Sequence, residues 1–143
     1  MREKTILLVE DNPDDVALTM RAFKKNQILN KVIVARDGSE ALDFLFGTED
    51  SPPIEMPEVI LLDINMPRMS GLEVLERIRS NERTRLLPVV VMTTSDEDRD
   101  RIDSYRLGAN SYISKPVEFE EFNKVVKQLG IYWLAVNIGP LGG

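Results

Sequence analysis

The chain has 143 residues, 43% of them hydrophobic and 29% charged, a length and composition typical of one folded domain with one buried core. These fractions exclude a disordered or collagen-like chain. The sequence contains neither cysteine nor histidine, which excludes disulfides, thiol nucleophiles, zinc sites with Cys or His ligands, and catalysis by imidazole. Any chemistry must come from carboxylates, lysines and hydroxyls.

The chain is acidic, with 18 basic and 24 acidic residues and a net charge of −6. Binding to nucleic-acid phosphates draws on a surplus of Lys and Arg, so we expect no nucleic acid as a direct partner. The apolar run over 5–9 is too short for the core of a signal peptide, and no stretch approaches the roughly 20 apolar residues of a membrane span. We therefore expect a cytoplasmic protein that does not contact a membrane.

Short apolar runs alternate with amphipathic stretches along the chain. The first run, Ile6 to Val9, is typical of a strand buried on both faces, and the next segment predicts a helix with Asn12 as N-cap and Pro13 at its first position. In chain order, the sequence predicts a strand over 6–9, a helix over 13–26, a strand over 32–35, a helix over 39–46, a strand over 59–62, a helix over 71–80, a strand over 89–92, a helix over 97–107, a strand over 111–113 and a helix from about 118. This alternation indicates βαβ units, a parallel sheet and an α/β fold with helices on both faces.

Polar side chains follow the predicted strands at the point where each strand ends. In such sheets, ligands bind at the carboxyl ends of the strands, where the strand order reverses. If strands one and three are neighbours, as in the order 2-1-3-4-5, then Glu10, Asp11 and Asp63 converge in one crevice, with Thr93 and Lys115 after strands four and five. Crowded carboxylates repel one another unless a cation binds them, and an oxygen-rich site of this kind suits Mg²⁺. The sequence therefore predicts a metal-assisted phosphoryl group on an aspartate.

Most of these residues also have a simpler explanation. The pair Glu10 and Asp11 could only stabilise a helix N-terminus, Thr93 could be a strand former, and Tyr112 could be a core aromatic. Asp63 has no comparable explanation, because it follows four apolar residues of a central strand, where an unpaired carboxylate is costly.

Four segments together resemble the signature blocks of response-regulator receiver domains. They occur in family order and at family-like spacing, and the resemblance extends over residues 4–129. The segments are Leu8-Val9-Glu10-Asp11-Asn12, Leu62-Asp63-Ile64-Asn65-Met66-Pro67-Arg68-Met69-Ser70-Gly71, Val91-Met92-Thr93-Thr94-Ser95 and Tyr112-Ile113-Ser114-Lys115-Pro116. The resemblance implies a flavodoxin-like (βα)5 fold with sheet order 2-1-3-4-5 and a partner histidine kinase that supplies the phosphoryl group from a phosphohistidine.

The resemblance also implies a phosphoacceptor and its metal ligands. Asp63 matches the phosphoacceptor, which also binds Mg²⁺. Asp11 matches a direct ligand of the metal, Glu10 a ligand through water, and Asn65 the residue that gives its backbone carbonyl. The implied cofactor is Mg²⁺, with Mn²⁺ or Ca²⁺ able to substitute.

Three further residues match the family's switch. Thr93 matches the hydroxyl that turns to bond the phosphoryl oxygen, Tyr112 the aromatic ring that changes orientation, and Lys115 the ammonium that pairs with the acyl phosphate. The bond between Lys115 and Pro116 is cis in the family, and only an X-Pro bond is cis at modest cost. A receiver catalyses its own phosphorylation and dephosphorylation, so we do not expect a conventional enzyme.

Other function classes fit the sequence less well. A flavodoxin needs a phosphate loop where this chain has the acidic segment 10–15, and a P-loop nucleotidase needs a G-x-x-x-x-G-K-S/T motif that the sequence lacks. A phosphatase of the haloacid dehalogenase class has a carboxylate two residues after its nucleophile, where this chain has Asn65. A degenerate receiver that acts only in docking or dimerisation remains as the alternative.

The end of the chain predicts an interface. We expect a receiver domain over 1–129, followed by an extension over 130–143 that holds no output domain, so that signalling takes place by protein contact. Apolar residues repeat at heptad spacing over 119–136, through Gly130, and predict a homodimer that forms through the last helix and the C-terminal tail; the alternative is a tail that folds back on its own domain. The residues expected in this interface are Phe122, Leu129, Tyr132, Trp133 and Val136.

The loop over 47–57 holds three prolines and is too polar for a helix or a central strand. A surface insertion is its simplest interpretation. This loop and the tail from Leu129 to Leu134 also resemble the small response regulators that partner bacterial and cyanobacterial phytochromes. That resemblance implies a phytochrome histidine kinase as the phosphoryl donor.

Overall fold

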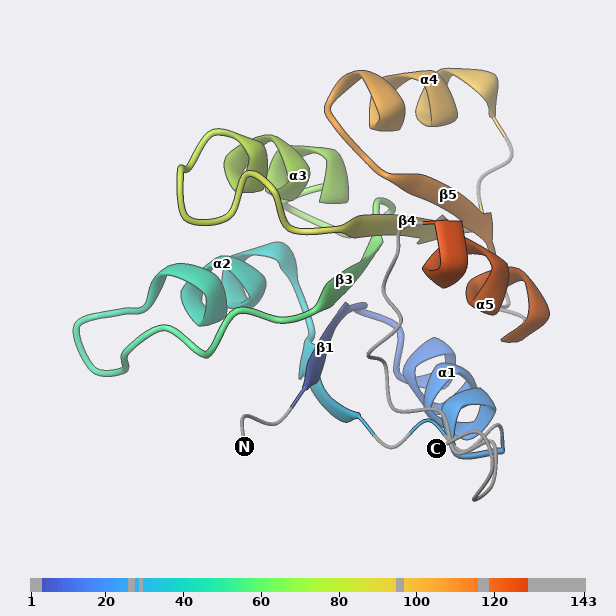
Figure 1. The fold of residues 1–143 in the computed structure, drawn as a ribbon. Coiled ribbons are helices and arrows are strands. Elements are labelled where there is room, and N and C mark those ends of the chain that lie inside the picture. The colour runs from blue at the N-terminus through green and yellow to red at the C-terminus, as the bar shows by residue number, and fades with distance from the viewer. Residues whose placement is uncertain (1–3, 26–27, 29, 95–96, 116–118, 129–143) are drawn as a thin grey trace.

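A computed structural model (Figure 1) describes residues 4–25, 28, 30–94, 97–115 and 119–128. Five strands alternate with five helices, as the sequence predicts, and each strand bound lies within one residue of its expected position. The elements are β1 (Thr5–Val9), α1 (Pro13–Lys25), β2 (Lys31–Ala35), α2 (Gly38–Phe46), β3 (Val59–Asp63), α3 (Gly71–Arg79), β4 (Val89–Thr93), α4 (Asp98–Arg106), β5 (Ser111–Ser114) and α5 (Phe119–Gln128). None of the helices in these ranges has the length and apolar character needed to cross a membrane.

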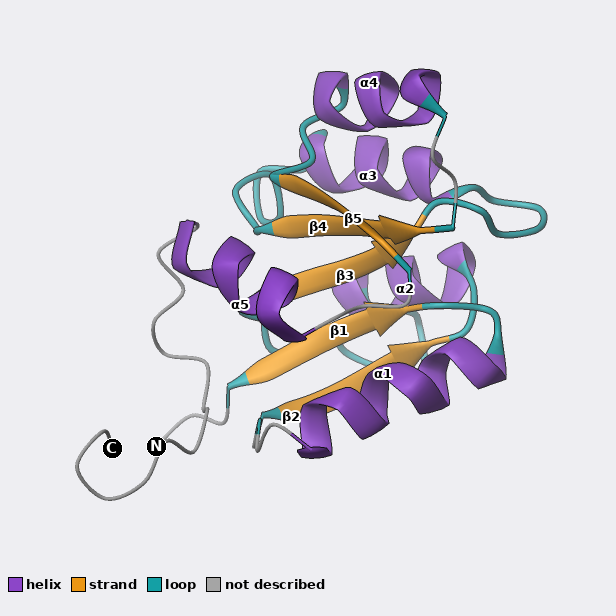
Figure 2. Cartoon of the chain, turned by 90° about the vertical axis from the view of Figure 1, so that its right-hand side faces the viewer, coloured by secondary structure: helices purple, strands orange, loops and turns teal. Residues whose placement is uncertain are grey.

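The five strands form one parallel sheet in the order β2-β1-β3-β4-β5. This order confirms the predicted fold and makes β1 and β3 neighbours. After β1 the chain continues to β2, which lies on one side of β1, and then crosses to β3 on the other side. The carboxyl ends of β1 and β3 therefore lie where the strand order reverses. Figure 2 shows α1 and α5 on one face of this sheet and α2 and α3 on the opposite face.

Alternate residues of the central strands form two separate apolar cores. On the side of α2 and α3, the strand residues Leu7, Ile60 and Val91 pack with Leu45 and Leu75. On the side of α1 and α5, other strand residues pack with helix residues, including Leu8, Leu61, Met92, Phe23 and Phe122. Since both faces of the sheet are covered, the central strands are apolar throughout, and a charged residue at their ends stands out.

The structure corrects one predicted interface residue. Phe122 of α5 is only 1% exposed, and its ring centroid lies 5.3 Å from that of Phe23 of α1. It therefore belongs to the core of its own chain and is not available to a second copy, because burial of this face of α5 on the sheet stabilises the domain itself. The other expected interface residues, Leu129, Tyr132, Trp133 and Val136, lie outside the described residues.

Local signals at the helix ends agree with the sequence. The Oδ1 of Asn12 accepts the backbone N–H of Asp14 at 2.8 Å and that of Asp15 at 3.3 Å, as an N-cap does. The α1 face that packs on the sheet holds Thr19 and Phe23, while Met20 is 38% exposed. The loop over 47–57 contains neither helix nor strand.

Candidate functional site

Three carboxylates meet at the carboxyl ends of β1 and β3. Val9 of β1 pairs with Leu62 of β3, so the next residues, Glu10 and Asp63, come side by side at the sheet edge. One oxygen each of Glu10, Asp11 and Asp63 lies within 4.8 Å of the others. Glu10 is fully buried and Asp63 is 3% exposed. The predicted convergence of these three residues is therefore present in the structure.

Hydrogen bonds from backbone N–H groups fix the end of β3 and the loop after it. The backbone N–H of Asn65 donates to Oδ1 of Asp63 at 3.0 Å, and the N–H of Gly71 donates to the carbonyl of Ile64 at 3.1 Å. A Cβ on Gly71 would lie 2.2 Å from the carbonyl oxygen of Asp63, so only glycine allows α3 to begin this close to the strand end.

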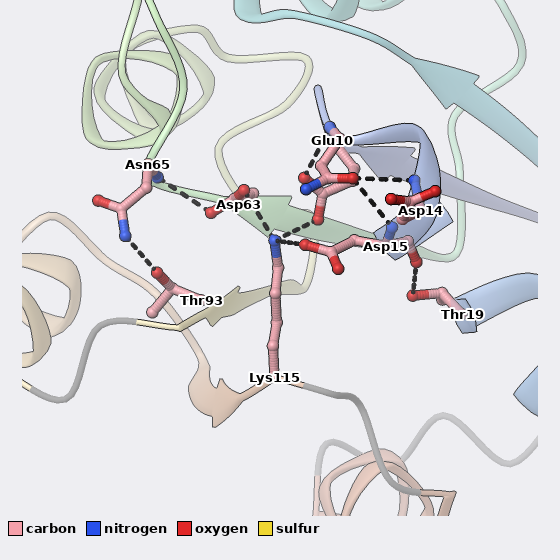
Figure 3. Close-up of polar contacts among 9 residues, drawn as sticks. Glu10, Asp14, Asp15, Thr19, Asp63, Asn65, Thr93 and Lys115 are labelled. Atoms are coloured by element: carbon pink, nitrogen blue, oxygen red, sulfur yellow. Dashed lines mark hydrogen bonds and ion pairs between the residues drawn. The ribbon is translucent and has the colours of Figure 1, made fainter. Parts of the chain in front are cut away.

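Lys115 places its ammonium among the carboxylates (Figure 3). Its Nζ lies 2.5 Å from Oε1 of Glu10, 2.9 Å from Oδ2 of Asp15 and 2.9 Å from Oδ2 of Asp63, and its side chain is 8% exposed. The backbone N–H of Lys115 donates to the carbonyl of Thr93 at 3.0 Å, which holds the residue after β5 against the end of β4. One ammonium thus compensates several buried or half-buried carboxylates.

Burial and the neighbouring charges shift the pKa values of Glu10 and Lys115. Burial raises the pKa of Glu10 from 4.5 to about 7; the hydrogen bond with Lys115 opposes this rise, while the negative charge of Asp63 adds to it. Burial alone lowers the pKa of Lys115, but its hydrogen bonds with Glu10, Asp15 and Asp63 outweigh this effect and raise the pKa above its usual value. The lysine is therefore a permanent cation in this site.

A hydroxyl group lies on the side of Asp63 away from the acidic pair. The side-chain amide of Asn65 donates to Oγ1 of Thr93 at 2.8 Å, and Thr93 is buried. Figure 3 shows Asn65 between Asp63 and Thr93, with its backbone turned to the carboxylate and its side chain to the hydroxyl. The threonine therefore has a polar partner within the same cluster that a phosphoryl group on Asp63 would enter.

The donor atoms of the three clustered carboxylates are chemically suited to a divalent cation. Glu10, Asp11 and Asp63 offer three carboxylate oxygens from two adjacent loops, the kind of ligand that Mg²⁺ prefers. Oε1 of Glu10 faces the Lys115 ammonium, and Oε2 of Glu10 accepts the backbone N–H of Asn12 at 3.2 Å. These three carboxylates carry more negative charge than one ammonium neutralises, so the donor set suits a divalent cation.

Of the remaining predicted residues, the structure describes Tyr112. Tyr112 is in β5, half-buried against the core on the side of α2 and α3. Pro116, and with it the predicted cis bond after Lys115, lies outside the described residues.

Sequence reasoning missed two contacts of this site. Asp15 follows Asp11 by one helical turn, a spacing that could have indicated a shared position, but the acidic start of α1 has a sufficient explanation in the helix dipole. The side chain of Asn65 was also missed, because only its backbone carbonyl was expected to act. Its bond to Thr93 joins residues 28 positions apart, which no local pattern predicts.

The comparison with protein families matches the response regulator receiver domain to residues 6–127. Among curated proteins, the probable methanogenesis regulatory protein FilR2 of Methanothrix harundinacea is 41% identical over 135 residues, which are 94% of this chain and 86% of that protein. Response regulator Rcp1 of Synechocystis sp. is 38% identical over 131 residues, which are 92% of this chain and 89% of Rcp1.

Solved structures of response regulators are also similar to this chain. The bacteriophytochrome response regulator AtBRR is similar with a TM-score of 0.84 and 45% identity, over 96% of this chain and 99% of that one. The Mn²⁺-bound form of Rcp1 is similar with a TM-score of 0.75 and 37% identity, over 96% of this chain and 99% of that one. Phytochrome-associated regulators are thus close relatives of this protein.

Proposed function

Because the chain belongs to the response regulator receiver domain family, we propose that Asp63 accepts a phosphoryl group from a phosphohistidine of a histidine kinase. An oxygen of the Asp63 carboxylate attacks phosphorus, so that an O–P bond forms while the P–N bond of the donor breaks. The electron pair of that bond stays on the imidazole, which takes up a proton as it leaves. The aspartyl phosphate is a covalent carboxylate intermediate that water later hydrolyses.

The observation that carries this proposal is the placement of Asp63 beside Lys115. Oδ2 of Asp63 lies 2.9 Å from Nζ at the end of a central strand. The ammonium can move from the carboxylate to a phosphoryl oxygen on the same residue, because both occupy nearly the same place and both are anionic. If the ion pair between Lys115 and Asp63 served only to stabilise the fold, two more carboxylates, Glu10 and Asp11, would not be needed beside it.

We further propose that Glu10, Asp11, Asp63 and the backbone carbonyl of Asn65 hold Mg²⁺, Asp11 directly and Glu10 through water. When bound, such a cation neutralises charge on the phosphoryl oxygens. The clustering of the three carboxylate oxygens supports this assignment, as does the existence of a Mn²⁺-bound structure of the relative Rcp1.

The response to phosphorylation is proposed to begin at Thr93. A phosphoryl group on Asp63 adds acceptor oxygens, to which the Thr93 hydroxyl would turn from its present contact with Asn65. Tyr112 lies in β5, the strand next to β4. Repacking of its half-buried ring would then carry the change to the surface that partners contact.

The partners are proposed from the relatives. The similarity to a bacteriophytochrome response regulator supports a phytochrome histidine kinase as donor in the cytoplasm. We propose that the receiver domain spans 1–129 and that the extension over 130–143 forms a homodimer, in which Leu129, Tyr132, Trp133 and Val136 take part. Their apolar character supports an interface, and the net charge of −6 supports output through protein contact without nucleic acid.

Intact-mass measurement after incubation with a small acyl-phosphate donor tests this function. We expect a Mg²⁺-dependent phosphoryl adduct in the wild type and none in Asp63→Asn. Asp50→Asn is the matched control, because it makes the same change at an exposed loop position and should keep the adduct. A wild-type protein that shows no adduct, or an adduct that persists in Asp63→Asn, would contradict the assignment and favour a receiver that acts only in docking.

A further inference from the structure

Lys115 has one partner that is not among the three clustered metal-site carboxylates. Besides Glu10 and Asp63, its ammonium contacts Oδ2 of Asp15 at 2.9 Å, and this contact is a hydrogen bond as well as an ion pair. The cation-binding group of clustered oxygens comprises Glu10, Asp11 and Asp63 and does not include Asp15. Asp15 therefore acts on the lysine and not on the predicted metal ligands.

The ammonium and a divalent cation compete for the same oxygens. Nζ of Lys115 lies within ion-pair distance of Glu10 and Asp63, two of the three clustered carboxylates. A cation that binds these oxygens repels the ammonium, since like charges at such distances interact strongly in a buried site. The lysine must then withdraw, and it keeps a counter-charge only if another carboxylate lies within its reach.

Asp15 is that carboxylate, and the start of α1 holds it in place. Its backbone N–H donates to Oδ1 of Asn12 at 3.3 Å, and its carbonyl accepts the hydroxyl of Thr19 at 2.9 Å. Its side chain is 27% exposed, whereas that of Lys115 is 8% exposed. Figure 3 shows the Asp15 carboxylate and the Asp63 carboxylate on different sides of the ammonium. The lysine can thus shift toward Asp15 without leaving the cluster.

We propose that Asp15 is a positioning residue that takes the Lys115 ammonium from Glu10 and Asp63 when a divalent cation binds. Asp15 itself contacts neither the cation nor the phosphoryl group. By removing a competing charge from the metal ligands, it strengthens the binding of Mg²⁺. This inference rests on the proposed function, because it assigns a new residue to the same metal-dependent site.

The test is the Mg²⁺ affinity, measured without any phosphoryl donor by the shifts of the Asp63 and Asn65 amide signals in ¹H–¹⁵N spectra. Asp15→Asn should weaken Mg²⁺ binding about tenfold, the lower end of the effect of losing a hydrogen bond between charged groups. Asp14→Asn is the matched control, because this exposed neighbour makes the same charge change and its side chain has no contact with Lys115. It should change the affinity less than about twofold, and Asp15→Glu should restore binding.

A double-mutant cycle with Lys115→Met shows whether Asp15 acts through the lysine. In that background Asp15→Asn should no longer weaken Mg²⁺ binding, since there is no ammonium to hold. An equal loss in both backgrounds would mean that Asp15 attracts the cation directly, and equal effects of Asp15→Asn and Asp14→Asn would mean that it has no special role. Both results overturn the inference but leave the proposed function intact. A wild-type protein that binds no Mg²⁺ would overturn the proposed metal site as well.

Discussion

Two half-buried cations lie at opposite ends of the sheet and have different partners. Lys115 lies at the carboxyl ends of the strands among the carboxylates of Glu10, Asp15 and Asp63. Arg79, the last residue of α3, lies near the start of β4 and β5. It donates to the carbonyls of Gly108 and Arg85 and to Oδ1 of Asn110, each at 3.0 Å.

The nature of the partners decides what each cation can do. The acceptors of Arg79 are neutral, and burial lowers the pKa of Arg79. Its planar donor group joins the loop between α3 and β4 to the loop between α4 and β5 in one fixed arrangement. The partners of Lys115 are carboxylates, and more of them are present than one ammonium can neutralise. The carboxylates around Lys115 keep excess negative charge and can bind a second cation, whereas the neutral acceptors around Arg79 carry no charge that would attract one. This contrast distinguishes Lys115, a cation of the proposed site, from Arg79, a cation that joins loops.

The largest effect is expected from Lys115→Met. At pH 8 without Mg²⁺ the free energy of unfolding should fall by about 4 kcal/mol, because removing one partner leaves buried carboxylates uncompensated. Mg²⁺ should restore part of this loss by binding the folded state. Urea unfolding with and without MgCl₂ measures both values, and a loss that Mg²⁺ leaves unchanged would contradict a shared site for the two cations.

A smaller effect is expected from the pH dependence of Glu10. Its pKa is raised from 4.5 to about 7 in the folded chain, so the folded state holds a proton that the unfolded state releases. The resulting stability is fully present below pH 4.5 and is lost as the pH rises through 7, by up to about 3 kcal/mol. Urea unfolding between pH 4.5 and 8 should show this decline in the wild type but not in Glu10→Gln. The same slope in both proteins would show that another group titrates.

The smallest effect is expected from Arg79→Met. Loss of its hydrogen bonds should lower the free energy of unfolding by about 2 kcal/mol, because three acceptors lose a donor and part of the site is open to water. The loss should be the same with and without Mg²⁺, and the phosphoryl adduct should persist. If the adduct disappears, or if Mg²⁺ reduces the loss, the two ends of the sheet are not independent and the comparison fails.

The fold was predictable from the sequence because the signals are local. Apolar runs of four or five residues mark the buried strands, Asn12 caps α1 as expected, and the residues after each strand identify the carboxyl edge of the sheet. The α1 face was less predictable, since Thr19 packs on the sheet together with Phe23 whereas the apolar Met20 is 38% exposed. The buried hydroxyl of Thr19 is satisfied because it donates to the carbonyl of Asp15 at 2.9 Å.

The sequence by itself determined the α/β class, the positions of the elements and the identity of the carboxylates, threonine and lysine at the strand ends, because periodicity and residue type are properties of the chain. Only the tertiary structure decided which further groups meet. It placed Asp15 against Lys115, 100 positions away, joined Asn65 to Thr93, and buried Phe122 in its own core. Such contacts depend on how distant segments pack, and packing is a property of the folded molecule as a whole.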